Sequence, residues 1–339
     1  MTRALWRAAA LSLFGAMSAL ADPVLKDFDD LKGWTDDTPS AALSVFLTTC
    51  GDLDPTDWAD VCVLAQDAQD ARAFFETQFL PVIFGAGGAA LFTGYFEPEI
   101  RASAERSPGY ETPLYRTPPD LPQGTPWKTR KEISNGALTG QGLEIAWAAD
   151  PVEAFFLQVQ GSGRLKLTDG TVNRLGFAAK NGHPYRSIGQ ELIRRGLFEP
   201  HQVSAQVISD WVARNPVEGQ ALLDHNPSFV FFREVNEVPS DKGPLGAMNR
   251  SVTPGRSIAV DPLYTPLGAP VWIEKDGASP IRRLMVAQDT GSAIKGKQRA
   301  DIFFGTGDDA GRQAGRIRDA GRMVTLLPTA MARRITGQN

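Results

Sequence analysis

The segment at residues 287–305, AQDTGSAIKGKQRADIFFG, places two acidic residues beside two apolar strands. The apolar residues on either side of its glycine-rich centre predict strands at 283–288 and 300–304. Asp289 directly follows the first strand, and Asp301 lies at the start of the second. Removing a carboxylate from water beside such strands is costly unless the group is hydrogen-bonded or functional, so this segment is a candidate site.

A third acidic residue, Asp261, follows another apolar strand at 257–260. Gly291, Gly296 and Gly305 flank two of the three aspartates and leave backbone room for a ligand. The residues alone support two interpretations. The three acids form a functional site, or each is an ordinary turn residue whose carboxylate accepts a hydrogen bond from a backbone N–H.

Composition indicates a folded protein without a cysteine-rich zinc site. The chain has 339 residues, of which 42% are apolar and 22% charged, so it can bury a large core and is not disordered throughout. Its net charge of −4 argues against a nucleic-acid-binding protein, which would show a basic surplus. With only 2 Cys, the chain cannot form a zinc site of four Cys, and it contains neither an H-E-x-x-H sequence nor a C-x-x-C pair.

Residues 1–21 have the order of a secretory signal peptide, with Arg3 and Arg7, then an apolar run, then an Ala-Leu-Ala cleavage site. A buried N-terminal helix is the alternative. The run is followed by no Cys that could carry a lipid, and no later segment is long and apolar enough to span a membrane. We therefore expect an exported protein, in which Cys50 and Cys62 can form a structural disulfide.

The rest of the chain shows a helical N-terminal part followed by a strand-rich remainder. We expect helices within 22–84, strands at 90–96 and 154–161, a hairpin at 164–178, helices that start at 187 and 203, strands at 228–235, 257–260, 271–273, 283–288, 300–304 and 323–327, a helix at 309–320, and a frayed tail at 329–339.

Two segments combine aromatic residues, amides and glycines, as sugar-binding grooves do. They are residues 94–98 (GYFEP) and 158–163 (QVQGSG). Ordinary strand-to-turn transitions explain the same composition, and composition alone favours that simpler interpretation.

Two further motifs are weak signals. The glycines at 305, 307 and 311 suggest a nucleotide-phosphate loop, but their spacing is not that of a dinucleotide-binding turn. Ser292-Ala293-Ile294-Lys295 matches the S-x-x-K of serine acyl-enzymes without the companion motifs of those enzymes.

Taken together, several longer strings resemble the family of membrane-bound lytic murein transglycosylase A (MltA), including its C-terminal 3D module. They occur in the family's order and cover roughly residues 90–327. They are TGYFEP (93–98), FLQVQGSG (156–163), NGHPYRSIG (181–189), NPSFVFF (226–232), GPLGA (243–247), SIAVD (257–261) and the segment 287–305.

The resemblance implies a mainly β fold with two domains and a glycan-binding groove between them. A double-psi β-barrel domain with N-terminal helices would consist of residues 22–102 and 241–328. A smaller β-rich domain, residues 103–240, would be inserted into it, and residues 329–339 would be a flexible tail.

The resemblance also implies an enzyme that cleaves the β-1,4 bond between N-acetylmuramic acid and N-acetylglucosamine in peptidoglycan and releases 1,6-anhydromuramoyl products. Asp301 matches the catalytic residue, and Asp289 and Asp261 match two supporting aspartates. Neighbouring negative charge and apolar walls would keep Asp301 protonated. A noncatalytic peptidoglycan-binding module, or a transpeptidase or amidase that acts on peptide stems, are the alternatives.

The resemblance further suggests the binding residues and partners. The expected substrate-binding residues are Gly94, Tyr95, Glu97, Gln158, Gln160, Gly161, Ser162, Gly163, Tyr185, Ser187 and Gly291. Peptidoglycan glycan strands are the expected partner, with other cell-wall proteins as further candidates, and no metal, organic cofactor or nucleic acid is implied. We expect a periplasmic monomer, with outer-membrane association left open because the signal lacks a lipid-accepting Cys.

Overall fold

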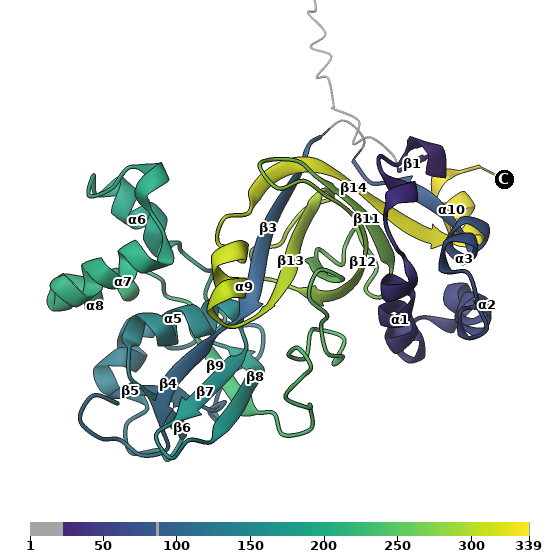
Figure 1. Ribbon diagram of the computed structural model, residues 1–339. Coiled ribbons are helices and arrows are strands. Elements are labelled where there is room, and N and C mark those ends of the chain that lie inside the picture. Colours follow the sequence, from purple (N-terminus) through teal and green to yellow (C-terminus); the bar gives the residue numbers. More distant parts are fainter. Residues whose placement is uncertain (1–22, 86–87, 339) are drawn as a thin grey trace, which may run out of the picture.

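Two β-sheets of different size organise the molecule (Figure 1). The computed structural model describes residues 23–85 and 88–338. The signal peptide expected at residues 1–21 lies outside the described residues. Within them, no helix combines the length and the apolar character that a bilayer crossing requires.

The larger sheet closes on itself. It has 8 strands in the order β1-β2-β14-β11-β12-β10-β13-β3, and β14 pairs with β3 as well. This additional pairing joins the strands from β14 to β3 into a barrel, whose interior holds Phe92, Met285 and Ile302. The strands are β1 (Val24–Leu25), β2 (Phe79–Ile83), β3 (Ala90–Glu97), β10 (Ser257–Val260), β11 (Pro270–Lys275), β12 (Ile281–Thr290), β13 (Arg299–Thr306) and β14 (Arg318–Pro328).

Strand β14 makes the closure possible because different parts of it pair with different neighbours. Residues 318–321 pair with β3, residues 321–325 with β11, and residues 325–328 with β2. Gly321 lies where the first two pairings meet. A Cβ there would lie 1.9 Å from the backbone oxygen of Glu274, so only glycine allows this approach.

Helices from both ends of the chain cover one side of the barrel around a second apolar core (Figure 1). These are α1 (Ser40–Thr49), α2 (Pro55–Gln66), α3 (Ala71–Gln78) and α10 (Thr329–Thr336). Phe79 of β2 and Trp272 of β11 extend from the strands into this core. The expectation of a frayed tail at 329–339 was wrong, because Ala332 of α10 is fully buried in the same core.

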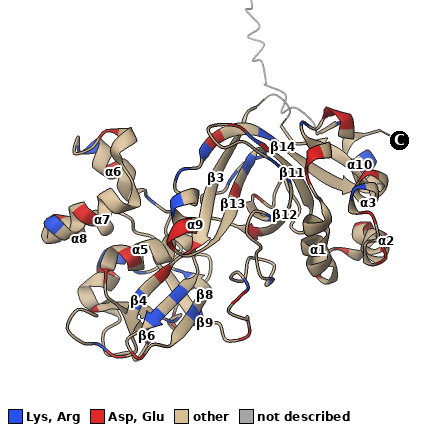
Figure 2. Ribbon diagram, viewed as in Figure 1, with Lys and Arg blue, Asp and Glu red and all other residues tan. Residues whose placement is uncertain are grey.

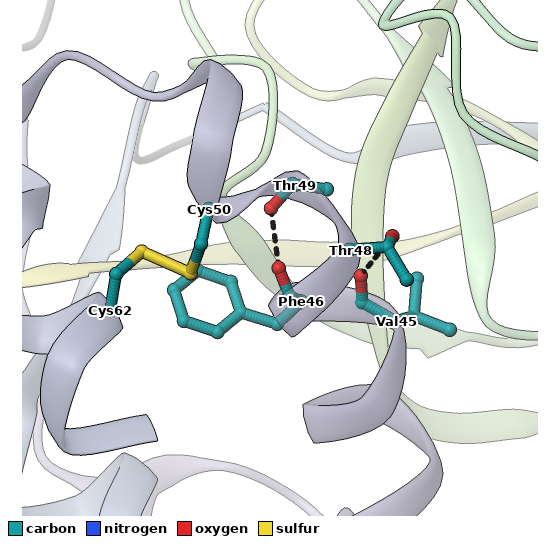
Figure 3. Close-up of a disulfide and its surroundings, with 6 residues drawn as sticks. All are labelled: Val45, Phe46, Thr48, Thr49, Cys50 and Cys62. Atoms are coloured by element: carbon teal, nitrogen blue, oxygen red, sulfur yellow. Dashed lines mark hydrogen bonds between the residues drawn. A yellow bond between two sulfur atoms is a disulfide. The ribbon is translucent and has the colours of Figure 1, made fainter. Parts of the chain in front are cut away.

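Cys50 and Cys62 form a disulfide between the end of α1 and helix α2 (Figure 3). Their Cα atoms are 5.6 Å apart, and the described residues contain no free cysteine. Thr49, just before Cys50, donates a hydrogen bond of 2.6 Å to the backbone oxygen of Phe46. The pair suggested by the sequence is therefore joined in the structure.

The smaller sheet has 6 strands in the order β5-β6-β4-β7-β8-β9. Its apolar core includes Leu114, Leu157, Leu165 and Phe232. The strands are β4 (Glu99–Ser103), β5 (Thr112–Tyr115), β6 (Glu144–Ala148), β7 (Gly163–Leu167), β8 (Val172–Lys180) and β9 (Val230–Glu234). The accompanying helices are α4 (Arg130–Glu132), α5 (Pro151–Gln160), α6 (Ile188–Arg194), α7 (Ala205–Arg214) and α8 (Pro216–Leu223).

The chain leaves the barrel at Pro98, between β3 and β4, and returns to it between β9 and β10. The domain boundary expected between residues 102 and 103 falls inside β4, which belongs entirely to the smaller sheet. A boundary at Pro98 fits the sheet membership better.

Other elements also differ from the sequence-based prediction. Residues 24–25 and 79–83, within the region 22–84 that was expected to be helical, form strands β1 and β2. The strand expected at 154–161 is helix α5, which starts with Pro151 after the cap Asp150, whose carboxylate accepts a hydrogen bond from the N–H of Val152. The helix expected at 309–320 is α9 (Gly307–Ala314), which ends early because β14 begins at Arg318. The hairpin predicted at 164–178 is present as β7 and β8.

Candidate active site

Two of the three aspartates lie on either side of one residue of the barrel sheet. Ala259 of β10 pairs with Asp289 of β12 and with Asp301 of β13. Asp301 in turn pairs with Thr93 of β3. Paired residues point to the same face of a sheet, so these side chains form a row across four strands.

A hydroxyl fixes the Asp301 carboxylate. The Thr93 hydroxyl donates a hydrogen bond of 2.5 Å to Oδ1 of Asp301. The guanidinium of Arg299 donates from Nη2 to the same hydroxyl oxygen at 2.8 Å. Because a guanidinium can only donate, the Thr93 oxygen accepts from Arg299 and its hydrogen points to Asp301.

Burial raises the pKa of Asp301 above its ordinary value. The Thr93 hydrogen bond and the Arg299 charge oppose this rise because both favour the ionised carboxylate. A raised pKa agrees in direction with the expected proton donor, with burial as the main cause.

Asp289 is held by three donors from different parts of the chain. Its Oδ1 accepts hydrogen bonds from the backbone N–H groups of Ala247 at 2.9 Å and Thr290 at 2.8 Å. Its Oδ2 accepts from the Tyr95 hydroxyl at 3.0 Å. Burial raises the pKa of Asp289 to about 6, the three donors lower it, and the charge of Asp301 adds to the rise. The carboxylate therefore orders Tyr95 and the loop at 247.

Tyr95 connects Asp289 to the row of side chains. Its ring lies 5.1 Å from the ring of Phe303, and its hydroxyl reaches Asp289. Burial and the two aspartates raise the pKa of this phenol well above its ordinary value, so it stays a hydrogen-bond donor. The structure thus brings Tyr95, Asp289 and Asp301 together.

Asp261 has different contacts. Its Oδ2 accepts a hydrogen bond from the N–H of Gly296 at 2.8 Å, and the Lys295 ammonium lies 3.8 Å from its Oδ1. The Gly296 hydrogen bond is the main cause of its lowered pKa. Within the described chain it makes no hydrogen bond to Asp289 or Asp301, so it holds the loop that connects β12 to β13.

Gly94 and Glu97 have packing and charge-pairing contacts. A Cβ on Gly94 would lie 2.7 Å from the Cα of Ala314, so this glycine lets α9 approach β3. Glu97 is fully buried, and several Lys and Arg positions lie on the strands of the smaller sheet (Figure 2). Arg164 and Arg174 lie 2.9 and 2.8 Å from its carboxylate oxygens. Gly94 thus packs α9 on the barrel, and Glu97 stabilises the junction between the sheets through buried ion pairs.

The QVQGSG segment supports the smaller sheet. The Gln158 amide oxygen accepts from Arg130 at 2.7 Å, and that of Gln160 accepts from the N–H of Phe96 at 3.1 Å. Gly161 ends α5 with φ 79°, and Gly163 packs so closely that a Cβ would lie 2.2 Å from Leu157. Ser162 is partly exposed.

The remaining expected binding residues are spread over separate loops. Ser187 caps α6, where its hydroxyl accepts from the N–H of Gln190. Tyr185 is 38% exposed, which leaves its ring available to a ligand. A Cβ on Gly291 would lie 2.7 Å from Ile294, so this glycine allows the turn after β12.

Sequence reasoning missed three residues of the site: Thr93, Arg299 and Ala247. Thr93 and Ala247 lie at the ends of strings that carry the family resemblance, so they could have been proposed from their positions there. Arg299 lies within the segment 287–305, but its contact with Thr93 depends on the parallel pairing of β3 with β13, which the sequence did not reveal.

The glycine motif and the S-x-x-K motif have other roles. A Cβ on Gly311 would lie 2.8 Å from the Phe96 ring, so this glycine packs α9 on β3. Lys295 pairs with Asp261, and no hydrogen bond joins it to Ser292 in the part of the chain that the structure describes. The described residues also contain no group of three or more His, Cys, Asp or Glu that could hold a metal.

A barrel with a desolvated, hydroxyl-bound carboxyl, joined to an inserted sheet, agrees with the fold and site that the family resemblance implies, and sequence comparison shows the enzyme class, that of the lytic transglycosylases. Residues 91–233 match the family described as MltA specific insert domain, and residues 256–327 match the 3D domain. The chain belongs to the family of membrane-bound lytic murein transglycosylase A.

Relatives in two organisms bear that name. The protein of Vibrio cholerae is 37% identical over 251 residues, 70% of this chain and 66% of the relative. That of Escherichia coli K12 is 38% identical over 257 residues, 72% of this chain and 67% of the relative. The matched segments thus span about two thirds of these relatives' length.

Solved structures show the same fold over nearly the whole chain. A membrane-bound lytic murein transglycosylase from Agrobacterium tumefaciens has a TM-score of 0.83 at 34% identity, covering 93% of this chain and 100% of that one. MltA from Neisseria gonorrhoeae has a TM-score of 0.75 at 32% identity, covering 91% of each chain. E. coli MltA with bound chitohexaose has a TM-score of 0.75 at 30% identity, covering 91% of this chain and 95% of that one.

Proposed function

We propose that this lytic murein transglycosylase cleaves the bond between N-acetylmuramic acid and N-acetylglucosamine with Asp301 as its single acid and base. The observation that carries the proposal is the environment of this carboxyl. It is desolvated, its pKa is raised, and one oxygen is fixed by Thr93. The chitohexaose bound by E. coli MltA supports a glycan strand as the ligand.

In the first step, protonated Asp301 donates its proton to the glycosidic oxygen while the bond from that oxygen to C1 of N-acetylmuramic acid breaks. A raised pKa keeps a larger fraction of the carboxyl protonated for this step. The Thr93 hydrogen bond favours the ionised form, so it stabilises the carboxylate that remains after the transfer.

In the second step, the ionised Asp301 accepts the proton of the C6 hydroxyl, and the C6 oxygen forms a bond to C1. The product is a 1,6-anhydro ring, no water is consumed, and Asp301 regains its proton. Most glycosidases need a second carboxylate as base or nucleophile. Here the substrate's own hydroxyl takes the place of that group, so one carboxyl serves both steps.

We assign a positioning role to Asp289. Three donors occupy its two oxygens, which leaves it poorly placed to attack a sugar. Its carboxylate holds Tyr95 beside Phe303. Asp261 acts indirectly, because it holds the loop at Gly296.

Digestion of purified sacculi in water enriched in ¹⁸O tests the chemistry. Intramolecular attack predicts anhydromuramoyl ends that contain no oxygen from the solvent. Reducing ends that carry one ¹⁸O atom would show hydrolysis instead, and trimmed stems without glycan cleavage would show action on the peptides. Mass spectrometry of the released fragments separates these three outcomes.

We also propose that the chain is exported to the periplasm by cleavage after residue 21 and acts there as a monomer. The order of charged, apolar and small residues at 1–21 supports export. The relatives are named membrane-bound, which supports a cell-envelope location.

A further inference from the structure

Arg130 is a buried cation in the smaller sheet, away from the row of aspartates. Only 5% of the residue is exposed. Its guanidinium carbon lies 4.6 Å from the centre of the Phe155 ring and 5.1 Å from that of Phe229. Two aromatic rings therefore hold the guanidinium and limit its contact with water.

Neutral groups supply the hydrogen-bond acceptors of Arg130. Its Nε donates to the backbone oxygen of Asn226 at 3.1 Å. Its Nη2 donates to the backbone oxygen of Ser228 and to the Gln158 amide, each at 2.7 Å. Within residues 23–85 and 88–338, Nη1 donates no hydrogen bond, and Arg130 forms no ion pair.

A buried charge without a countercharge is costly, so this arrangement calls for an explanation. Desolvation lowers the pKa of Arg130 to about 10, while Asp224 and Tyr185 act on it only through space. The guanidinium remains charged at neutral pH. An anionic ligand at Nη1 would supply the missing partner.

Arg130 lines a cavity of about 300 Å³, a size at the lower end of small-ligand sites. Phe155, Phe229 and Gln158 border the same cavity, so the groups that hold the guanidinium also form the walls. Trp147 adds an aromatic face, and Glu144 adds a carboxylate close enough to help raise the pKa of Tyr115 to about 12. Arg106, which lies over the Trp147 ring, and Glu111 also line it, so the cavity offers two cations, two anions and apolar walls.

Two of the strings that carry the family resemblance meet at this cavity. Neither string contributes to the row of aspartates. NPSFVFF supplies the carbonyl oxygens of Asn226 and Ser228 and the ring of Phe229. FLQVQGSG supplies Gln158, and Phe155 directly precedes that string. Both strings therefore serve to place one guanidinium in the cavity wall.

We propose that this cavity binds the end of a peptidoglycan stem peptide, with the free peptide carboxylate on Arg130 and an ammonium group near Glu144. The inference rests on the proposed function, because that function makes peptide-bearing glycan strands the substrate. A carboxylate satisfies Nη1 with a charge-assisted hydrogen bond, and Phe155, Phe229 and Trp147 pack against the aliphatic part of the peptide.

Calorimetric titration with two synthetic tripeptides tests the proposal without relying on a variant. The probes are L-Ala-γ-D-Glu-meso-diaminopimelate as the free acid and the same peptide amidated at its terminal carboxyl. The acid should bind about 10- to 100-fold more tightly than the amide, the range for loss of one charged hydrogen bond. Equal affinities, or no binding of the acid at millimolar concentration, would overturn the proposal.

Arg130→Met places the interaction at the cavity, with Arg116→Met as the matched control on an exposed arginine outside it. Only Arg130→Met should lower the affinity for the free-acid peptide to that for the amidated peptide. It should also raise KM about 10-fold on peptide-bearing strands and leave peptide-free strands unaffected. Unchanged acid affinity in folded Arg130→Met contradicts the assignment, and if this variant unfolds, the two-peptide comparison decides alone.

The two proposals fail in different experiments. Tripeptide binding involves no glycan cleavage and does not need Asp301. Hydrolytic products in ¹⁸O water would contradict the proposed function, whereas the measured peptide affinities would still test the cavity. Anhydro products with no peptide affinity would remove only the inference about the cavity.

Discussion

The Thr93 hydroxyl favours ionisation of Asp301, against the effect of burial. It donates to the carboxylate because Arg299 supplies a hydrogen bond to its oxygen from the other side. Arg299 has backbone oxygens as further acceptors, at Leu91 and Ala300, which fix its guanidinium. The ionisation of one carboxyl thus depends on a relay across β3 and β13.

Thr93→Val should therefore raise the pKa of Asp301, because it removes a hydrogen bond to the ionised form and keeps the side-chain shape. The alkaline limb of the pH–rate profile should move to higher pH. Release of anhydromuropeptides measured across pH checks this, with exposed Thr168→Val as the control. A profile that moves to lower pH would show that the hydroxyl does not favour the ionised carboxylate.

Asp289 lowers stability at neutral pH because its pKa is about 6 in the folded protein and 3.8 in the ordinary case. A raised acid pKa stabilises the fold below pH 3.8, and this contribution is lost as pH rises through about 6. Asp289→Asn removes the penalty and keeps the shape.

At pH 7 the unfolding free energy of the variant should be about 1–3 kcal/mol higher than that of the natural protein. Near pH 3 the two values should differ little. Urea denaturation at both pH values checks this. Its activity should fall less than that of an Asp301 variant, since Asp289 positions rather than transfers the proton. Lower stability at pH 7 would indicate that the three donors to Asp289 outweigh its desolvation.

At the scale of elements, α9 depends on two glycines that allow it to lie against β3. Gly94→Ala would place a methyl group 2.7 Å from the Cα of Ala314 and 2.8 Å from the Phe304 ring. We expect a loss of about 1–3 kcal/mol in unfolding free energy, the usual cost of overpacking. Gly51→Ala is the control, since its Cβ would meet no atom within 4 Å. Equal denaturation curves for the two variants would contradict this packing.

The disulfide connects α1 to α2 across a short loop, because the two cysteines are separated by 12 positions in the sequence. Closing such a loop restricts the unfolded chain by an amount worth roughly 2–4 kcal/mol at most. The double change Cys50→Ser and Cys62→Ser should lower the unfolding free energy within that range. Thiol titration of the denatured, unreduced protein should find no free Cys, whereas two free thiols would disprove the bridge.

Short apolar runs limited the prediction of individual elements. Residues 154–161 (AFFLQVQG) are mostly apolar, and such a short run suits a buried strand as well as a buried helix. The cap Asp150 and Pro151 gave the information needed to identify α5. The tail at 329–339 carries few apolar residues, yet Ala332 packs fully into the N-terminal core, a contact that requires the barrel.

At the scale of the molecule, most barrel strands could be predicted, but their neighbours could not. The strands at 257–260, 283–288 and 300–304 were visible as apolar runs with an acid at one end. The placement of Asp289 and Asp301 beside Ala259 follows from register, which no local pattern encodes. Family resemblance identified the acids, and only the pairing of β3 with β13 revealed Thr93 and Arg299.

The assembly of two sheets also explains why many expected sugar-binding residues have structural contacts. Glu97 and Gln160 lie where β3, β7 and α5 meet, so these two residues help to join the sheets. Motifs at such junctions look like ligand sites in sequence because both combine glycines with polar residues. Their buried contacts distinguish the two cases.

The central claim is that Asp301 alone transfers the proton, and Asp301→Asn tests it most directly. The change keeps size and hydrogen bonding nearly the same but removes the acid, so anhydromuropeptide release should fall by about 10⁴-fold or more, beyond the usual range for one acid or base. Sacculus binding should remain, and Asp289→Asn should lose less activity. Retained turnover in folded Asp301→Asn, or a larger loss in Asp289→Asn, would show that a different carboxylate performs the reaction.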